Sequence, residues 1–144
     1  HVGNAVTIAN KVGLSGFVQV GDHTVFGGMA GAHQFVRIGC YCMVGGLYRV
    51  AKDVPPYTLA AGEPLRLEGL NSVGLKRAGF SAETRKAIRT FYRELYRRDR
   101  RFTDSLEELR GRRDAFILEV QNALDFYEGS QRGVTFWGHG SESD

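Results

Sequence analysis

Residues 2–55 of the chain read VGNAVTIANKVGLSGFVQVGDHTVFGGMAGAHQFVRIGCYCMVGGLYRVAKDVP. An apolar residue stands at every sixth position of this stretch: Val2, Ile8, Leu14, Val20, Phe26, Ala32, Ile38, Val44 and Val50. A period of six fits neither an α-helix nor an alternating β-strand. It fits a solenoid in which each six residues make one short strand and one turn, so that three units close a triangular coil. The nine units predict about three coils of stacked parallel strands.

The residue that follows each apolar position is small in eight of the nine units, and the exception is His33. Glycine adopts tight backbone turns at no steric cost, so we expect these small residues to turn the corners of the coil. His33 breaks the rule, which marks it as a candidate functional residue.

Pro55 and Pro56 cannot donate ladder hydrogen bonds and are expected to end the solenoid. We therefore divide the chain into a β-helix over residues 1–57, a connecting loop over 58–80, an α-helical domain over 81–133 and a flexible tail over 134–144. Val2 is already in register and no Met precedes it, so His1 is expected to be an internal residue of a longer protein.

Three helices are expected in the second half of the chain. Ser81 is the predicted N-cap of the first, whose apolar stripe includes Ile88 and Tyr92. Ser105 and Glu108 form a predicted capping box for a second, short helix. The third helix is predicted from Asp114 to Gly129.

The chain carries a net charge of +3, and its basic residues gather between Lys76 and Arg113. A solvated helical surface is the simpler interpretation, and an acidic partner is the alternative. No nucleic-acid motif is recognisable, and no stretch reaches the ~18 apolar residues of a membrane span. Cys40 and Cys42 lack the partner ligands of a zinc site, so we expect two reduced thiols in a cytosolic protein.

Eight short motifs follow one another along the chain: Gly27-Gly28-Met29, His33-Gln34-Phe35, Met43-Val44-Gly45-Gly46, Asp53-Val54-Pro55-Pro56-Tyr57, Gly69-Leu70-Asn71, Gly74-Leu75-Lys76-Arg77, Gly79-Phe80-Ser81 and Ser130-Gln131-Arg132-Gly133. This ordered set resembles the UDP-N-acetylglucosamine O-acyltransferases of lipid A biosynthesis. The resemblance extends to Gly133 and implies a left-handed parallel β-helix of about three coils followed by a small α-helical C-terminal domain.

The resemblance also implies an activity. Members of the family are cytoplasmic homotrimers with active sites between neighbouring prisms. They move a 3-hydroxyacyl chain from acyl carrier protein to the 3-hydroxyl of UDP-GlcNAc, the first step of lipid A biosynthesis. The resemblance implies neither a metal nor a cofactor beyond the 4'-phosphopantetheine of the carrier.

The catalytic parts implied by the resemblance are a general base and an oxyanion donor. The family's basic His falls upstream of His1, outside this chain, so the chain alone is expected to be inactive. The backbone N–H of Gly16 matches the oxyanion donor. Phe17 stands where the family usually has a substrate-binding His, and its ring is expected to pack against substrate instead.

The remaining implied site residues bind substrate or set acyl length. His33 and Gln34 match substrate-cleft residues, although a lone His is more often a packed or surface residue. Gly28 and Gly46 match the acyl-length region, where a solenoid corner is an equally good explanation of the glycines.

Asn71 and Arg77 match residues near the nucleotide and pantetheine phosphates, for which Arg is well suited. Besides Phe17, two positions depart from the family pattern: Val73 stands where some members have an acidic residue, and Ala78 stands where members often have a second Arg.

Three other functions compete with this interpretation. The first is a related hexapeptide acyltransferase, which uses acetyl-CoA or transfers an N-acyl chain to a 3-acyl-glucosamine nucleotide. The second is a non-enzymatic trimerisation scaffold. The third, a carbonic-anhydrase-like protein, needs more suitably spaced histidines than the four in this chain.

Overall fold

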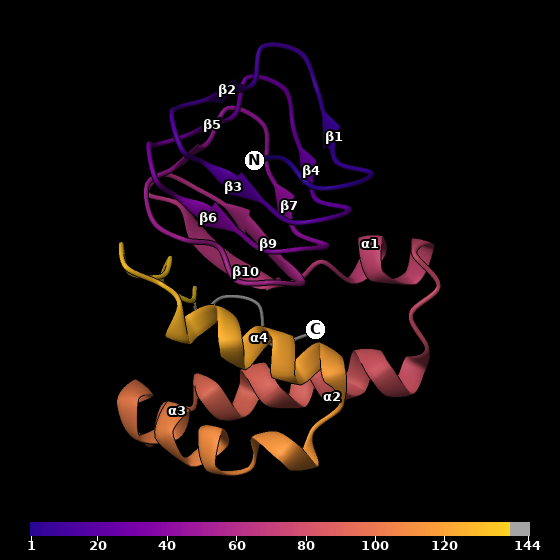
Figure 1. Cartoon of the computed structure of the whole chain (residues 1–144), viewed down its shortest axis with the longest axis vertical. Helices are drawn as coiled ribbons and strands as arrows, with labels where there is room; N and C mark the ends of the chain where they lie inside the picture. Colours follow the sequence, from indigo (N-terminus) through magenta and orange to yellow (C-terminus); the bar gives the residue numbers. More distant parts are fainter. Residues whose placement is uncertain (139–144) are drawn as a thin grey trace.

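The computed structural model describes residues 1–138 and consists of a β-helix above a layer of helices (Figure 1). Eight two-residue strands build the coils, and each begins six residues after the one before it. They are β1 (Thr7–Ile8), β2 (Gly13–Leu14), β3 (Gln19–Val20), β4 (Val25–Phe26), β5 (Gly31–Ala32), β6 (Arg37–Ile38), β7 (Met43–Val44) and β8 (Arg49–Val50). The predicted left-handed β-helix of about three coils is confirmed.

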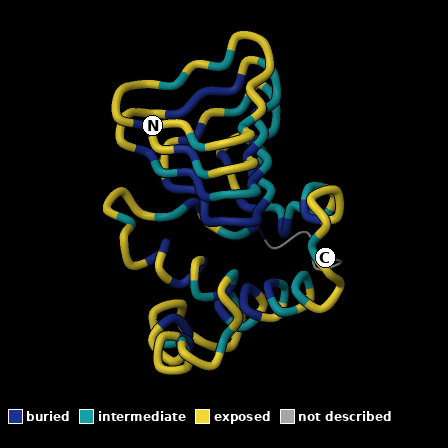
Figure 2. The backbone as a smooth tube through the Cα atoms, turned by 45° about the vertical axis from the view of Figure 1, so that its right-hand side comes forward, coloured by how far each residue is buried: buried dark blue, intermediate teal, exposed yellow. Residues whose placement is uncertain are grey.

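The strands form three faces: β1-β4-β7, β2-β5-β8 and β3-β6. Neighbours on a face pair in parallel, and the partner of each residue is the one a full coil away, as Val25 pairs with Thr7 and Met43. The apolar residues of the units, among them Phe26 and Val44, form a buried core. Dark blue buried segments accordingly run through the coils in Figure 2. Val2 and Ile8 are exposed because no coil of this chain lies above them.

The turns between faces stack into three corners, which we number. Corner 1, between the β3-β6 and β1-β4-β7 faces, contains residues 4–5, 22–23, 40–41 and 56–57. Corner 2, between the β1-β4-β7 and β2-β5-β8 faces, contains residues 10–11, 28–29 and 46–47. Corner 3, between the β2-β5-β8 and β3-β6 faces, contains residues 16–17, 34–35 and 51–53.

The residues that turn the chain are not the small ones, and this corrects the expectation from the sequence. The second residue of each two-residue turn has φ between 54° and 71°: Ala5, Lys11, Phe17, His23, Met29, Phe35, Tyr41, Leu47 and Tyr57. None of these left-handed residues is Gly.

The small residues are needed for a different reason, which is the close stacking of the coils. A Cβ on Gly27 would lie 2.4 Å from Gly46 N, and one on Gly39 would lie 2.5 Å from Pro56 N. Neither Gly is left-handed. At corner 3 the equivalent residues are Ser15, His33 and Ala51, so at this corner every coil carries a side chain in that position.

Residues 58–80 are not a loop. They form strand β9 (Thr58–Ala61), strand β10 (Arg66–Leu70) and helix α1 (Ser72–Arg77). Strand β9 pairs in parallel with β7, so the β1-β4-β7 face continues past the prolines. The prolines fit because they lie at corner 1, outside the ladder, and the chain can resume donating hydrogen bonds after them. Strand β10 then pairs antiparallel with β9.

The helical layer contains α2 (Ala82–Leu95), α3 (Phe102–Gly111), a 3₁₀ turn η1 (Arg113–Ala115) and α4 (Leu118–Glu128). Ser81 caps α2 as predicted, because its Oγ accepts a hydrogen bond from Thr84 N at 3.0 Å. The capping box at Ser105 is wrong, since α3 begins at Phe102 and Ser105 lies buried inside it. The third helix begins at Leu118, later than Asp114, and is capped by Gly129 as predicted.

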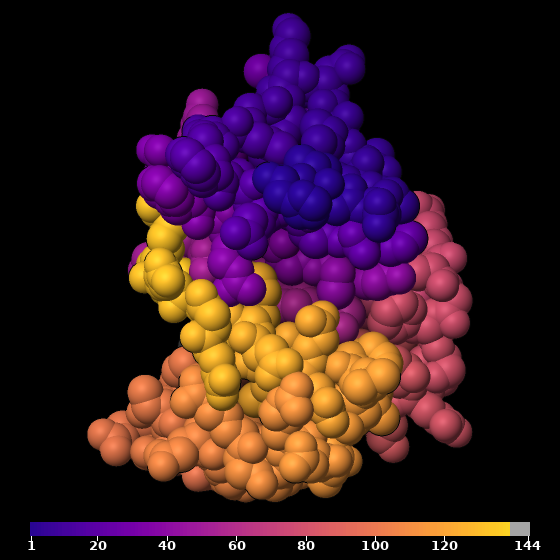
Figure 3. All heavy atoms as spheres, viewed as in Figure 1, coloured from indigo at the N-terminus to yellow at the C-terminus, as the bar shows by residue number. Residues whose placement is uncertain are grey.

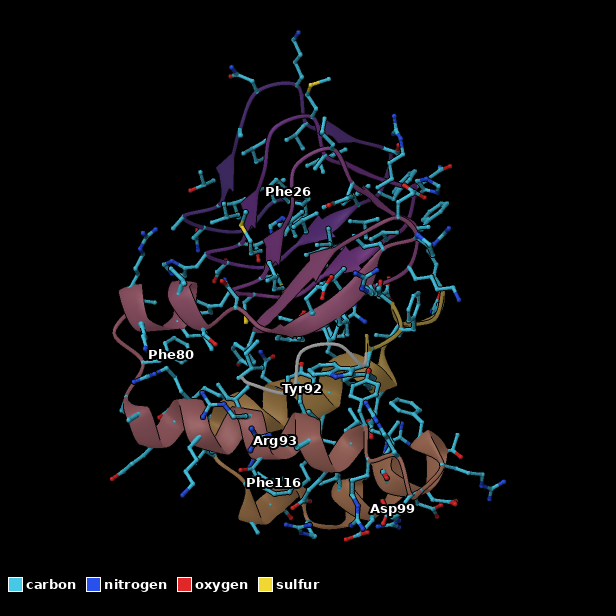
Figure 4. All side chains as sticks on the ribbon, turned by 180° about the vertical axis from the view of Figure 1, so that it is seen from behind. Phe26, Phe80, Tyr92, Arg93, Asp99 and Phe116 are labelled. Atoms are coloured by element: carbon cyan, nitrogen blue, oxygen red, sulfur yellow. The ribbon has the colours of Figure 1, made fainter. Side chains whose placement is uncertain are left out.

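The helical layer is tied to the base of the solenoid. Tyr92 points from α2 toward the coils, and its hydroxyl donates to Pro56 O at 2.7 Å (Figure 4). Phe80 packs edge-on against Tyr41 with ring centroids 4.8 Å apart. Within residues 1–138, no helix combines the length and the apolarity needed to cross a bilayer.

Residues 134–138 are part of the packed structure, so the predicted tail is wrong for them, and residues 139–144 lie outside the described part of the chain. Thr135 N donates to Asp53 O, and Leu67 N donates to Phe136 O. Trp137 contacts both hydrophobic cores. The yellow end of the chain in Figure 3 accordingly runs from the helical layer to the side of the coils. We call residues 130–138 the C-terminal strap.

Candidate functional site

Corner 3 holds the predicted oxyanion donor and the aromatic residue beside it. Gly16 is exposed, and in the described part of the chain its N–H has no hydrogen-bond acceptor. Phe17 is left-handed and 74% exposed. Its ring stacks on that of Phe35, one coil away, with centroids 5.2 Å apart and planes within 9°. A free N–H therefore lies next to an exposed aromatic platform.

The predicted substrate residues His33 and Gln34 lie at the same corner, one coil below Gly16. Both are exposed. The Gln34 side chain reaches toward Gly16, because its Nε2 lies 3.6 Å from where a Cβ on that Gly would be. His33 N donates to Val50 O at 2.9 Å, which fixes its backbone to the third coil. Four predicted site residues thus come together: Gly16, Phe17, His33 and Gln34.

The predicted acyl-length residues lie at corner 2 instead. Leu47 N donates to Gly28 O, and a Cβ on Gly46 would lie 3.0 Å from the same oxygen. The two glycines are therefore stacked. They are flanked by the exposed apolar side chains of Met29 and Leu47. This corner therefore exposes two apolar side chains beside two stacked glycines.

Asn71 and Arg77 lie beside corner 1. The Asn71 side chain donates to Tyr41 O at 3.0 Å and accepts from Gly74 N at 3.3 Å, so it holds the start of α1 against the corner. Arg77 is exposed in the last turn of α1. The two positions that depart from the family pattern, Val73 and Ala78, are both exposed.

The candidate residues are therefore divided among all three corners of one prism. The residues predicted to stabilise the oxyanion and to bind substrate lie at corner 3, the two glycines lie at corner 2, and Asn71 and Arg77 lie beside corner 1. Different corners of one prism do not face a common space. A site that uses all of them has to be built from the corners of neighbouring copies.

Sequence reasoning missed the partners of these residues. Phe35 lies one full coil from Phe17, whereas Met29 and Leu47 directly follow Gly28 and Gly46 and lie one coil from each other, so the 18-residue repeat carried the signal for them. Asp53 was noted only as part of a motif, yet it is 1% exposed and accepts hydrogen bonds from Arg37 N and Ser130 Oγ. Its contacts with residues 130–135 span most of the chain length, and no local pattern predicts them.

The cysteines are structural. Burial raises the pKa of the Cys42 thiol to about 12, and burial also raises the pKa of Cys40. Both thiols stay protonated at neutral pH, which makes them poor nucleophiles. Asn122 Nδ2 donates to Cys40 Sγ at 3.4 Å and to the Tyr57 hydroxyl at 3.1 Å. Among the described residues, no three His, Cys, Asp or Glu side chains converge as metal ligands.

The chain matches known proteins over most of its length. It is 40% identical over 133 residues to the acyl-[acyl-carrier-protein]–UDP-N-acetylglucosamine O-acyltransferase of Thiobacillus denitrificans, covering 92% of this chain and 51% of that protein. The Burkholderia lata protein of the same name is 39% identical and is covered to 52%. The chain thus spans about half the length of these relatives.

Solved structures agree with the fold. The UDP-N-acetylglucosamine O-acyltransferase of Moraxella catarrhalis superimposes with a TM-score of 0.83 at 36% identity, over 92% of this chain and 51% of that one. The Arabidopsis UDP-N-acetylglucosamine acyltransferase gives 0.84 at 34% identity, over 92% and 49%. A sequence model described as "Udp N-acetylglucosamine O-acyltransferase; Domain 2" matches residues 53–135. The chain belongs to the UDP-N-acetylglucosamine O-acyltransferase family.

Proposed function

We propose that these residues supply the C-terminal part of an enzyme that transfers a 3-hydroxyacyl chain from acyl carrier protein to the 3-hydroxyl of UDP-GlcNAc, in lipid A biosynthesis. Family membership supports this proposal. The observation that carries the site assignment is the cluster at corner 3, where a free backbone N–H, an imidazole and a carboxamide lie on one exposed edge.

In this proposal the corner-3 groups act on the acyl carbonyl and the sugar. The Gly16 N–H stabilises the oxyanion that forms when the 3-hydroxyl attacks the thioester. His33 and Gln34 orient the sugar by hydrogen bonds. The proton of the hydroxyl passes to a general base outside this chain. Collapse of the oxyanion breaks the C–S bond and expels the pantetheine thiolate, which takes up that proton. No dissociable cofactor or metal is required, since the acyl chain arrives on the 4'-phosphopantetheine of its carrier.

The working unit in this proposal is a homotrimer. Its support is the division of the candidate residues among three corners, together with the exposed apolar side chains at corners 2 and 3. Neighbouring prisms would bring corner 3 of one copy to another corner of the next. Burying the exposed rings and the Leu47 side chain would stabilise such contacts.

Acyl carrier protein is the proposed partner of the basic helices. Lys76, Arg77, Lys86 and Arg93 form no ion pair within the described part of the chain, whereas Arg112 and Arg113 are paired with Glu94 and Asp125. Unpaired cations attract an acidic partner more strongly than paired ones do.

The two cysteines, Cys40 and Cys42, are not joined in a disulfide. Free thiols fit a reducing compartment, and we propose a cytoplasmic location.

Binding of UDP-GlcNAc to this chain tests the nucleotide part of the proposal. Arg77→Ala should weaken binding about tenfold or more, because a charge-assisted bond to phosphate contributes about 1.5–3 kcal/mol. Lys86→Ala removes an equally exposed cation from α2 and should leave the affinity unchanged. Equal losses in both variants, or tighter binding of acetyl-CoA than of UDP-GlcNAc, would contradict the assignment.

Acyl transfer tests the proposal that the general base lies outside this chain. This chain alone should not turn over acyl carrier protein and UDP-GlcNAc, and activity should require the upstream half of a family member supplied together with it. Robust turnover by the chain alone would show that the base lies within these residues. A trimer that binds neither substrate would favour the non-enzymatic scaffold.

A further inference from the structure

The third coil is shorter than the others at corner 3. Gly21 N donates to Ile38 O, 17 residues later, whereas Gly39 N donates to Val54 O, only 15 residues later. His33 N still donates to Val50 O, 17 residues later, so the shortening falls between Val50 and Val54. No residue of this corner is left-handed in the third coil, unlike Phe17 and Phe35 above it.

This shortening removes a main-chain acceptor that the second coil needs. In the regular register Gln19 N donates to Val36 O. The equivalent donor one coil later is Arg37 N, and its acceptor is the side chain of Asp53, with Oδ1 at 2.8 Å. A buried carboxylate thus replaces a carbonyl of the ladder.

The same carboxylate is held by the C-terminal strap. Ser130 Oγ donates to Asp53 Oδ2 at 2.6 Å. The Asp53 backbone is bonded on both sides, since Asp53 N donates to Gly133 O and Thr135 N donates to Asp53 O. Arg132 donates twice to Ala51 O, at 3.1 and 3.2 Å. Asp53 therefore joins three parts of the molecule: the second coil, the third coil and the strap.

We propose that Asp53 is a positioning residue for the corner-3 site and that the strap acts on the site through it. The backbone of His33 and Gln34 is held from below by Val50 at one end of the corner and by Asp53, through Arg37, at the other. Loss of the carboxylate removes the hydrogen bond at the Arg37 end of this segment. The His33 and Gln34 side chains are then no longer held in a fixed position relative to the third coil. The effect of Asp53 on substrate binding rests on the proposed function, whereas its effect on the backbone of residues 33–37 does not.

Amide hydrogen exchange measured residue by residue on this chain tests the effect of Asp53 on the backbone of residues 33–37. Asp53→Ala and Ser130→Ala should accelerate exchange of the His33, Phe35 and Arg37 amides, on the order of tenfold for Arg37, which loses its acceptor in the first variant. The Met29 and Leu47 amides of corner 2 should keep their rates. Asp53→Asn keeps one carbonyl acceptor and should restore most of the protection of Arg37.

Ser81→Ala serves as the control, because it lowers stability at a helix cap far from corner 3. Ser81→Ala should not accelerate amide exchange at one corner more than at the other. Equal acceleration at corners 2 and 3 in Asp53→Ala would show a general loss of stability and overturn the proposal. So would unchanged exchange at His33, Phe35 and Arg37.

UDP-GlcNAc affinity adds the functional readout. Asp53→Ala should weaken binding while Asp53→Asn restores it, at temperatures where both variants are folded. Failure of the unmodified chain to bind UDP-GlcNAc would count against the proposed function only, since the exchange data judge the positioning role independently. Tight binding that Asp53→Ala leaves unchanged would overturn the positioning role.

Discussion

At the scale of single residues, the distance between neighbouring coils determines which positions of the solenoid require glycine. Gly39 and Gly13 show the contrast: a Cβ on Gly39 would lie 2.5 Å from Pro56 N, whereas one on Gly13 would meet nothing within 4 Å. The same residue type is thus indispensable at one position and replaceable at another. Only the position relative to the next coil distinguishes them.

Gly39→Ala should therefore destabilise the chain by about 1–3 kcal/mol, the usual cost of overpacking against atoms that cannot move aside. Gly13→Ala should change the free energy of unfolding by less than about 0.5 kcal/mol. Urea denaturation of both variants measures the difference. Similar costs for the two would mean that backbone freedom, rather than close stacking, selects glycine in this fold.

Buried Cys42 makes a prediction about pH. Its pKa is about 12 in the folded chain, against an ordinary value of 9.0. Above pH ~9 the unfolded chain loses this proton while the folded chain keeps it, so stability is full below that pH and falls as the pH rises toward 12. The slope approaches about 1.4 kcal/mol per pH unit for this group. Burial raises the pKa of Tyr57 and Tyr96 as well, and these add to the loss above pH ~10.

Denaturation of Cys42→Ala between pH 8 and 10 tests this assignment, because the variant should show a flatter pH dependence than the unmodified chain. Val36→Ala is the matched control, since it also removes buried side-chain atoms from the solenoid core but no titratable group. It should be less stable at every pH and keep the original slope. Identical slopes in all three proteins would contradict the role of Cys42.

At the scale of the elements, two serines of the helical layer have opposite roles. The Ser81 Oγ caps α2 by accepting from Thr84 N. The Ser105 Oγ is buried inside α3 and has no hydrogen-bond partner in the described part of the chain. A capping hydroxyl stabilises a helix, whereas a buried hydroxyl without a partner costs free energy.

Ser81→Ala should thus lower stability by about 1 kcal/mol. Ser105→Ala should be neutral or should raise stability by up to about 1 kcal/mol, because it removes the desolvated hydroxyl and improves helix propensity. Thermal denaturation measures both. A clear loss in Ser105→Ala would show that its hydroxyl is satisfied in solution, for example by a buried water.

For the whole molecule, the exposed apolar side chains predict association of copies. Leu47 is 69% exposed at corner 2, and Leu118 is 77% exposed in the helical layer. Both are largely exposed in one copy, so their replacement should hardly affect the folded monomer. In the proposed trimer, the surface around Leu47 is buried between copies, whereas the surface around Leu118 is not.

Leu47→Asp should therefore convert a species of three times the chain mass into a monomer, because it places a charge in the proposed interface. Leu118→Asp should leave the mass unchanged. Light scattering after size-exclusion chromatography gives both masses. A monomeric unmodified chain, or equal effects of the two substitutions, would remove the support for a site shared between copies.

Prediction from sequence succeeded for what repeats within the chain. The six-residue period gave the coils, their inward residues and the parallel register, and Ser81 and Gly129 marked helix ends correctly. It failed where an element depends on distant partners. Strand β9 was missed because Pro55 and Pro56 were read as an end, although corner 1 accommodates them. The four predicted site residues at corner 3 lie together because Gly16 and Gln34 are separated by one full coil.

The sequence by itself determined the β-helix and which residues share a corner, because a fixed repeat converts separation along the chain into position in space. Only the tertiary structure decided two other things. One is the place of Asn71 and Arg77 beside corner 1, which depends on how β9, β10 and α1 pack against the coils. The other is the strap on Asp53, which joins residues 77 apart through one buried carboxylate. Such a contact leaves no periodic trace, because its two ends are brought together by the packing of everything between them.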